Sequence, residues 1–298
     1  MAFFCSIFPS FTYIMMMPES KAEKVMKKKH SRQLVLLVFL LLYNFLLGEV
    51  LTMRSQASIL KESTCQNRSF REQFLFPALY DEIAKKEEME DCLTATMLKG
   101  NFQPQEIFTD FSIYQRFKPK EYILLRDSYS AVWSDLEVFP IPVRNDRSIS
   151  EEISYENTFG TARSFGGNRT HEGCDLFGTV KAAGFYPVIS MTEGVVEKIG
   201  WLPLGGYRIG IRATHGGYFY YAHLASYERN FQPGETVSSG DILGYMGDTG
   251  YGEEGTTGRF PVHLHLGIYI TTLEGRELSV NPYHVLKAME KKTRKYTY

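Results

Sequence analysis

Six of the seven histidines of this 298-residue chain fall between residues 171 and 284. Two of them, His263 and His265, alternate with apolar residues in PVHLHLGIYI, residues 261 to 270. Side chains of a strand point alternately to its two faces, so both imidazoles should point to the same face. Such a pair is either two hydrogen-bonded core histidines or part of a chemical site, and the pair alone does not decide between them.

Other histidines supply further donors at short spacing. His171 and Asp175 lie in HEGCD, and His223 lies in YAHL. A catalytic zinc is bound by three nitrogen or oxygen ligands from the protein and keeps one position open. An isolated H-x-x-x-D pattern arises often by chance. The ordered set of H-x-x-x-D, AHL and HLH within one region favours a metal centre.

Three other residues of this region, two histidines and a cysteine, are interpreted as structural. His215 lies in the turn THGGY, and His284 follows the expected start of the last helix. Cys174 precedes Asp175 directly, so on a strand its thiol would face away from the carboxylate. None of the three is expected to bind the metal.

The elements that must position these donors are short strands. The segments YPVISMTEGVVEKIGWL, YRIGIRATHGGYFYYAHL and DILGYMGDTGYG are rich in β-branched and aromatic residues and are punctuated by glycine, which is typical of strands and tight turns. By alternation, Tyr221 should share a face with His223 and could contact a substrate. A terminal helix is predicted to start at Asn281-Pro282, with Asn281 as its N-cap.

The chain before this β region reads as helical. The apolar spacing from residue 67 to 98 predicts helix, with Pro77 near a first turn and the charged run 81–91 exposed. One or two short helices are expected over 101–137. The stretch FPIPV, residues 139 to 143, predicts an extended connector.

The N-terminal part carries a membrane signal. Five lysines and Arg32 precede the apolar run at residues 34–47, which indicates export with the basic side left in the cytoplasm. We favour a single-pass anchor over residues 33–53 rather than a signal cleaved near residues 55–57. The apolar residues 1–17 are interpreted as an over-extended start.

Composition bounds the remaining possibilities. The formal net charge is only −1, so no global field points to nucleic acid as a partner. Three cysteines follow the membrane segment, and this odd number is not a disulfide framework. A bond between Cys65 and Cys92 remains possible.

We divide the chain into a basic segment 1–32, a membrane segment 33–53, a helical region 54–143, a β domain 144–290 and a basic, disordered tail 291–298.

Four motifs, RTHEGCD, GGYFYYAHL, GDILGYMGDTG and HLHLGIYI, resemble those of the lysostaphin/LytM-type zinc metallopeptidases, peptidase family M23. The resemblance runs from about residue 171 to 282 and keeps the family's motif order. It implies a compact, mainly β, antiparallel-sheet domain with a groove. It also implies cleavage of peptide bonds in peptidoglycan stem peptides or cross-bridges.

Carried over by position, the resemblance makes His171, Asp175 and His265 the ligands of one Zn²⁺. His223 and His263 become the two catalytic histidines, and which of them is the general base stays open. Zinc would activate a water and polarise the scissile carbonyl, while the imidazoles would take a proton and steady the oxyanion.

The sequence departs from the family pattern after Gly258. It reads TTGRFPVHLHLGIYI, with extra residues before the first histidine and no acid after the second. This departure concerns specificity rather than the metal site.

We therefore expect an exported zinc metalloendopeptidase that acts on peptidoglycan and is membrane-attached or, if the segment is cleaved, secreted. The alternative is a catalytically silent LytM-like interaction module or activator of other wall enzymes. All five expected site positions are present, which favours the enzyme. A sugar-binding β domain with incidental histidines fits the motif order poorly.

Overall fold

A computed structural model describes residues 20–164 and 167–298. Two compact units are distinguished, of which one ends at Ser55 and the other comprises Gln56–Tyr298. The interpretation of residues 1–17 as an over-extended start falls outside the described residues.

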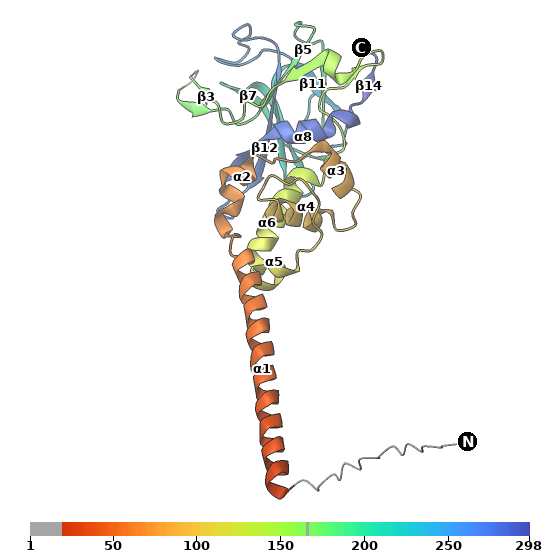
Figure 1. Ribbon diagram of the computed structural model, residues 1–298. Coiled ribbons are helices and arrows are strands. Elements are labelled where there is room, and N and C mark those ends of the chain that lie inside the picture. The colour runs from red at the N-terminus through yellow and green to blue at the C-terminus, as the bar shows by residue number, and fades with distance from the viewer. Residues whose placement is uncertain (1–19, 165–166) are drawn as a thin grey trace, which may run out of the picture. The chain divides into compact units, whose positions relative to one another are not determined.

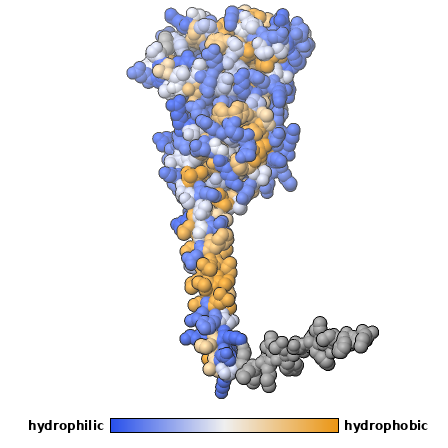
Figure 2. Space-filling model, viewed as in Figure 1, coloured by the Kyte–Doolittle hydropathy of each residue, from blue (hydrophilic) through white to orange (hydrophobic). Residues whose placement is uncertain are grey.

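The first unit is a single long helix over its described part. Helix α1, Lys21–Ala57, spans 37 residues, and it contains the predicted membrane segment 33–53. Its apolar side chains from Leu34 to Leu51 are exposed, and Figure 2 shows them as a continuous hydrophobic surface. Among the described residues α1 is the one helix long and apolar enough to cross a membrane.

The second unit begins with short helices. They are η1 (Glu62–Gln66), α2 (Arg68–Arg71), α3 (Pro77–Ile83), α4 (Met89–Lys99), α5 (Ser112–Phe117) and α6 (Pro119–Trp133). Pro77 occupies the first turn of α3, as predicted. The helical pattern of 67–98 is broken into three pieces. One break falls at Gln73, whose φ of 50° is incompatible with a helix and whose buried amide accepts a hydrogen bond from Trp133 Nε1.

The main element of the rest of this unit is an antiparallel sheet. Its central order is β10-β7-β8-β9-β12-β5-β2, with β13 pairing β12, and β11 pairing β9 and β6. The strands are β2 (Ile153–Tyr155), β5 (Cys174–Gly178), β6 (Pro187–Ile189), β7 (Gly194–Leu202), β8 (Gly206–Ala213), β9 (Tyr218–Tyr227), β10 (Thr236–Val237), β11 (Ile242–Met246), β12 (Leu264–Thr271) and β13 (Glu277–Val280). A separate hairpin joins β3 (Ala162–Arg163) to β4 (Arg169–Thr170). The mainly β, antiparallel class expected for this region is confirmed.

Alternation along the strands separates a core face from a groove face. On β12, Leu264, Leu266 and Ile268 are fully buried, and His265 points to the opposite face. Figure 1 shows helix α8, Pro282–Met289, lying between the strands and the helices α3, α4 and α6. The Asn281 side chain caps α8 by accepting from the Tyr283 amide, which confirms the predicted helix start.

The helical and β parts of this unit share one hydrophobic core. Buried side chains from α2 to α6 and from the sheet belong to the same cluster. The FPIPV connector is irregular, with bends at Pro140 and Ile141. Phe139, Ile141 and Val143 are buried, so it runs through the interior rather than across the surface. The predicted division at residue 143 remains a prediction, and it does not coincide with a gap in the core.

The prediction that the basic tail, residues 291–298, is disordered is wrong. Strand β14, Lys295–Tyr296, pairs in parallel with β1, Val143–Arg144. The Tyr298 hydroxyl donates to the Pro142 carbonyl, and the Tyr298 ring packs against Phe185. Backbone pairing and aromatic contacts outweigh the local preference of a charged segment for solvent.

Candidate metal and catalytic site

Three predicted ligands meet at one point. His171 Nε2 lies 3.1 Å from Asp175 Oδ1 and 3.1 Å from His265 Nδ1. His265 Nδ1 lies 2.9 Å from Asp175 Oδ1. Among the described residues these three side chains form a group that could hold a metal ion. Two imidazoles and one carboxylate are the donor types that zinc prefers.

Strand pairing brings two of these ligands together. His265 on β12 stands directly opposite Asp175 on β5, so neighbouring strands fix their separation. Gly173 provides room for the His265 ring, because a Cβ at residue 173 would lie 2.7 Å from His265 Nε2 and 2.4 Å from the Leu266 carbonyl oxygen. The glycine of HEGCD therefore allows close approach of β5 and β12.

A residue that the sequence did not single out holds the far side of the cluster. Arg163, on the β3–β4 hairpin, places Nη2 2.7 Å from Asp175 Oδ2 and 2.9 Å from His171 Nδ1. Thr158 Oγ1 lies 3.0 Å from the same His171 nitrogen. Arg163 thus occupies one carboxylate oxygen and leaves Oδ1 to the imidazole nitrogens. Nothing in the spacing of Arg163 from His171 indicated this contact.

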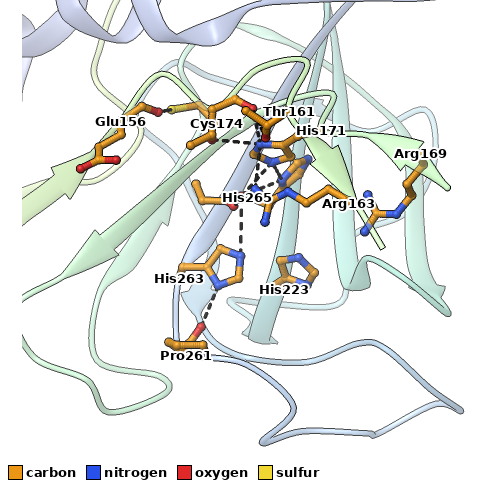
Figure 3. Close-up of polar contacts among 12 residues, drawn as sticks. Glu156, Thr161, Arg163, Arg169, His171, Cys174, His223, Pro261, His263 and His265 are labelled. Carbon is orange, nitrogen blue, oxygen red and sulfur yellow. Dashed lines mark hydrogen bonds and ion pairs between the residues drawn. The ribbon is translucent and has the colours of Figure 1, made fainter. Parts of the chain in front are cut away.

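The other two predicted histidines lie beside the cluster. The ring centroids of His223 and His263 are 4.8 Å apart, and Figure 3 shows the two imidazoles side by side below His265 and Arg163. His223 Nδ1 lies 2.8 Å from the Thr249 carbonyl, and His263 Nδ1 lies 2.7 Å from the Pro261 carbonyl. Each Nδ1–H donates to its carbonyl, because a carbonyl only accepts. In the neutral ring this leaves Nε2 with a lone pair.

Burial sets the protonation of these two rings. Desolvation lowers the pKa of His223 well below its ordinary value, and the neighbouring His263 adds to this effect. Desolvation also lowers the pKa of His263, although Asp175 opposes the shift. Both rings are therefore neutral near pH 7, in the form that can accept a proton at Nε2.

The Asp175 carboxylate at the centre of the cluster stays charged, whereas the two rings stay neutral. Burial alone would raise the pKa of Asp175, but hydrogen bonds with His171 and His265 outweigh it and hold that pKa well below its usual range. Desolvation lowers the pKa of His171. An ionised Asp175 carboxylate beside a neutral His171 imidazole is the protonation state that a metal ion requires of these ligands.

A β-bulge explains how His223 reaches this site. Tyr207 pairs with Leu224, and Ile209 pairs with Tyr221, so Arg208 alone stands opposite two residues of β9. His223 has a φ of 62°. The extra residue shifts the alternation and turns His223 toward the groove face.

The expectation for Tyr221 is therefore wrong. Tyr221 is fully buried on the core face, and its hydroxyl accepts from the Met191 amide at 2.9 Å. Its neighbour Tyr220 faces the groove instead, with its ring 6.1 Å from that of His265. Simple alternation from His223 back to Tyr221 could not foresee the bulge.

A groove of about 910 Å³ contains the cluster. All five predicted site residues line it, together with Arg163, Tyr220, Phe260 and residues of β7 and β8. Phe260 lies against His223, with ring centroids 4.6 Å apart, and shields that ring from water. The arrangement can bind a metal ion, accept a proton beside it and hold an extended chain along the sheet.

The residues interpreted as structural lie elsewhere. His215 Nδ1 lies 2.7 Å from Asp135 Oδ1, and the His284 ring packs on Phe74. Cys174 is fully buried on the core face, and its thiol donates to the Glu156 carbonyl. Cys65 and Cys92 are both free thiols.

Comparison with known proteins places this geometry in a family. The model of "Peptidase family M23" matches residues 169–282. The chain is similar to an L-Ala–D-Glu endopeptidase of Bacillus subtilis (strain 168), with 42% identity over 172 residues, covering 57% of this chain and 49% of the relative. It is also similar to the glycyl-glycine endopeptidase ALE-1 of Staphylococcus capitis, with 35% identity over 88 residues, covering 29% and 22%. The chain thus spans about half the length, or less, of these curated relatives.

A solved structure matches over a greater length. The crystal structure of a candidate glycyl-glycine endopeptidase, lytM, from Ruminococcus gnavus shares 39% sequence identity and a TM-score of 0.70, covering 82% of this chain and 98% of its own. A match of that extent reaches beyond the β domain into the helical region. The helices therefore belong to a shared architecture.

Proposed function

The chain belongs to peptidase family M23, and we propose that it is an exported zinc metalloendopeptidase that hydrolyses peptide bonds in bacterial peptidoglycan. The observation that carries this proposal is the meeting of three ligand atoms with two further neutral imidazoles in one groove. The L-Ala–D-Glu and glycyl-glycine bonds named for the relatives are the two classes of bond considered.

The cluster fits a zinc ion. The three donor atoms lie 2.9–3.1 Å apart, close to the edge of about 3.3 Å of a tetrahedron with zinc–ligand bonds near 2.0 Å. We therefore assign His171, Asp175 and His265 as its ligands. A zinc ion bound there would supply Lewis-acid polarisation of the scissile carbonyl and activation of a water molecule.

The remaining chemistry belongs to the protein. His223 and His263 keep Nε2 available because Nδ1–H of each ring is committed to a backbone carbonyl. One neutral imidazole can accept the proton of the attacking water, and a protonated ring can then donate to the developing oxyanion or the leaving amine. His263 Nε2 lies 3.7 Å from Asp175 Oδ1, next to the ligand cluster where this transfer must occur.

Helix α1 of the first unit supports a proposal for where the protein lies in the cell. Helix α1 is long and apolar enough to span a bilayer, and the lysines before the apolar run would stay on the cytoplasmic side. We propose a single-pass anchor with residues 56–298 outside the cytoplasm. Cleavage near residues 55–57 would instead release the same unit.

Zinc content and peptidoglycan digestion test the proposal together. We expect the detergent-solubilised chain to bind one zinc and to release peptides from purified peptidoglycan. His265→Ala should lose both zinc and activity because it removes a ligand. His263→Ala should retain zinc and lose activity. A wild-type protein that binds no zinc and releases no peptide would instead support the silent interaction module.

A further inference from the structure

Arg208 is an arginine of the groove for which the described residues supply no neutralising partner. The cationic side chains that line the groove are Arg163, Arg169, Lys198 and Arg208. Arg163 pairs with Asp175, and Lys198 Nζ lies 3.1 Å from Glu277 Oε1. Within residues 20–164 and 167–298, the Arg208 guanidinium makes no ion pair or hydrogen bond, and its Nη1 is buried without an acceptor. Arg208 thus brings to the groove lining a positive charge that the described residues do not neutralise, which a bound anion could do.

The position of Arg208 ties it to the reaction site. Arg208 stands on β8 opposite the bulge that turns His223 into the groove. Ile209 and Ile211 occupy the core face of β8 and are fully buried, so alternation directs Arg208 to the groove face. Burial raises the pKa of the Tyr220 hydroxyl, and the positive charge of the nearby Arg208 opposes that rise.

The distance from the metal cluster suits a neighbouring residue of a bound peptide. Strand β8 is separated from β12 by β9 alone, so Arg208 and His265 are two strand spacings apart, or about 10 Å. An extended peptide covers this distance in about three residues. A carboxylate within that range of the scissile bond could reach the guanidinium.

We propose that Arg208 binds a carboxylate of the substrate, so that the groove takes an acidic peptide rather than an uncharged oligoglycine bridge. Guanidinium matches a carboxylate with two parallel hydrogen bonds, and Arg208 lines the groove in which the peptide would lie. The inference rests on the proposed peptidase function and deepens it. Stem peptides that contain L-Ala–D-Glu belong to the acidic class, and glycine bridges do not.

A matched pair of peptides tests the inference. One contains L-Ala–D-Glu with a free D-Glu α-carboxylate, and the other carries the carboxamide at that position. We expect the wild-type chain to favour the acid in kcat/KM by about tenfold to a hundredfold, the range of a charge-assisted hydrogen bond. Arg208→Gln should abolish this preference by slowing the acidic peptide alone. Arg208→Lys should retain part of this preference, because lysine keeps the positive charge but cannot form the two parallel hydrogen bonds of a guanidinium.

Two controls separate this inference from the proposed reaction. Arg276→Gln removes an arginine that is exposed and absent from the groove lining, so it should leave the preference unchanged. Calorimetric binding of both peptides by the zinc-depleted chain measures discrimination without cleavage. Equal binding of acid and amide by a folded wild type, or an equal loss for both in Arg208→Gln, would overturn the assignment of Arg208. Discrimination in binding without cleavage of either peptide would instead sink the proposed reaction and uphold Arg208.

Discussion

Asp175 shows how one carboxylate is shared between a ligand role and a structural role. Its Oδ1 faces the nitrogens of His171 and His265, and its Oδ2 accepts from Arg163. Side chains that hold metal ligands from behind restrict their rotation and prepare the site before the ion arrives. At this scale Arg163 is a positioning residue for Asp175. His171 instead needs its own Nδ1–H, which can donate to the Thr158 carbonyl, in order to offer Nε2 to a metal ion.

Removal of Arg163 should weaken metal binding. In Arg163→Gln we expect zinc affinity to fall about tenfold to a hundredfold, as for other residues that orient metal ligands, while the fold is retained because Arg163 is one-third exposed. Competition with a chromophoric chelator measures the affinity directly. Arg68→Gln, at an arginine 88% exposed in its side chain, is the matched control. Unchanged affinity in Arg163→Gln would contradict the positioning role.

The sequence predicted the five expected site residues because each lies in a short local motif. His263 directly precedes strand β12, which carries His265, and His171 and Asp175 are four residues apart. Arg163, Tyr220 and Arg208 were missed for a physical reason. Their places depend on a hairpin and on a bulge that pairs one residue with two, and neither feature leaves a periodic pattern in the chain.

At the scale of elements, a buried carboxylate joins four segments near the edge of the sheet. Glu152 ends helix α7, Ile149–Glu152, and is 1% exposed. It accepts from Arg144 Nη2 on β1 at 2.6 Å and from the Tyr186 hydroxyl before β6 at 2.6 Å. Thr179 Oγ1, after β5, donates to it at 3.4 Å. The helix α7 was not predicted from sequence, since four residues carry little periodicity.

This network should make the protein sensitive to acid. Burial alone would raise the pKa of Glu152, but hydrogen bonds from Tyr186 and Arg144 outweigh it and lower that pKa below 4.5. A lowered folded-state pKa means that stability is present above the unfolded-state pKa and is lost as pH falls through the folded-state pKa. We expect Glu152→Gln to lower the free energy of unfolding by about 1–3 kcal/mol at pH 7, and by less at pH 3.

Urea denaturation followed by tryptophan fluorescence at both pH values checks this dependence. Glu274→Gln, at an exposed glutamate, should change stability little at either pH. A Glu152→Gln deficit that is as large at pH 3 as at pH 7 would show that packing, rather than ionisation, carries the effect.

At the scale of the molecule, the helical region packs on the sheet as part of one unit. Arg71 Nε donates to the Ser279 carbonyl on β13 at 2.8 Å, and Asn281 Nδ2 donates to Glu72 Oε2 at 2.9 Å. His215 in the β8–β9 turn binds Asp135 just after α6. The helices thus hold β13 and the turn before β9, next to the strands that carry the site.

The sequence analysis divided the helical region from the β domain because it depends on local composition. The change from helical to strand patterns near residue 143 is real, and the class of each part was predicted well. The shared core was not foreseen, because contacts such as Arg71 with Ser279 join residues 208 positions apart. The proline-rich connector looked like a linker, yet its apolar side chains face inward.

Gly217 offers a direct test of this coupling. Gly217 precedes β9, and a Cβ there would lie 1.9 Å from the Ala131 carbonyl oxygen of α6. Since backbone atoms cannot yield as a side chain can, Gly217→Ala should separate α6 from the sheet at a cost of about 1–3 kcal/mol. We expect a lower melting temperature and new proteolytic cleavage within residues 58–138. Gly48→Ala, where the added Cβ meets nothing within 4 Å, should do neither. If Gly217→Ala lowered the melting temperature without exposing the helices to protease, the strain would be confined to the β8–β9 turn. The helices would then not depend on this contact.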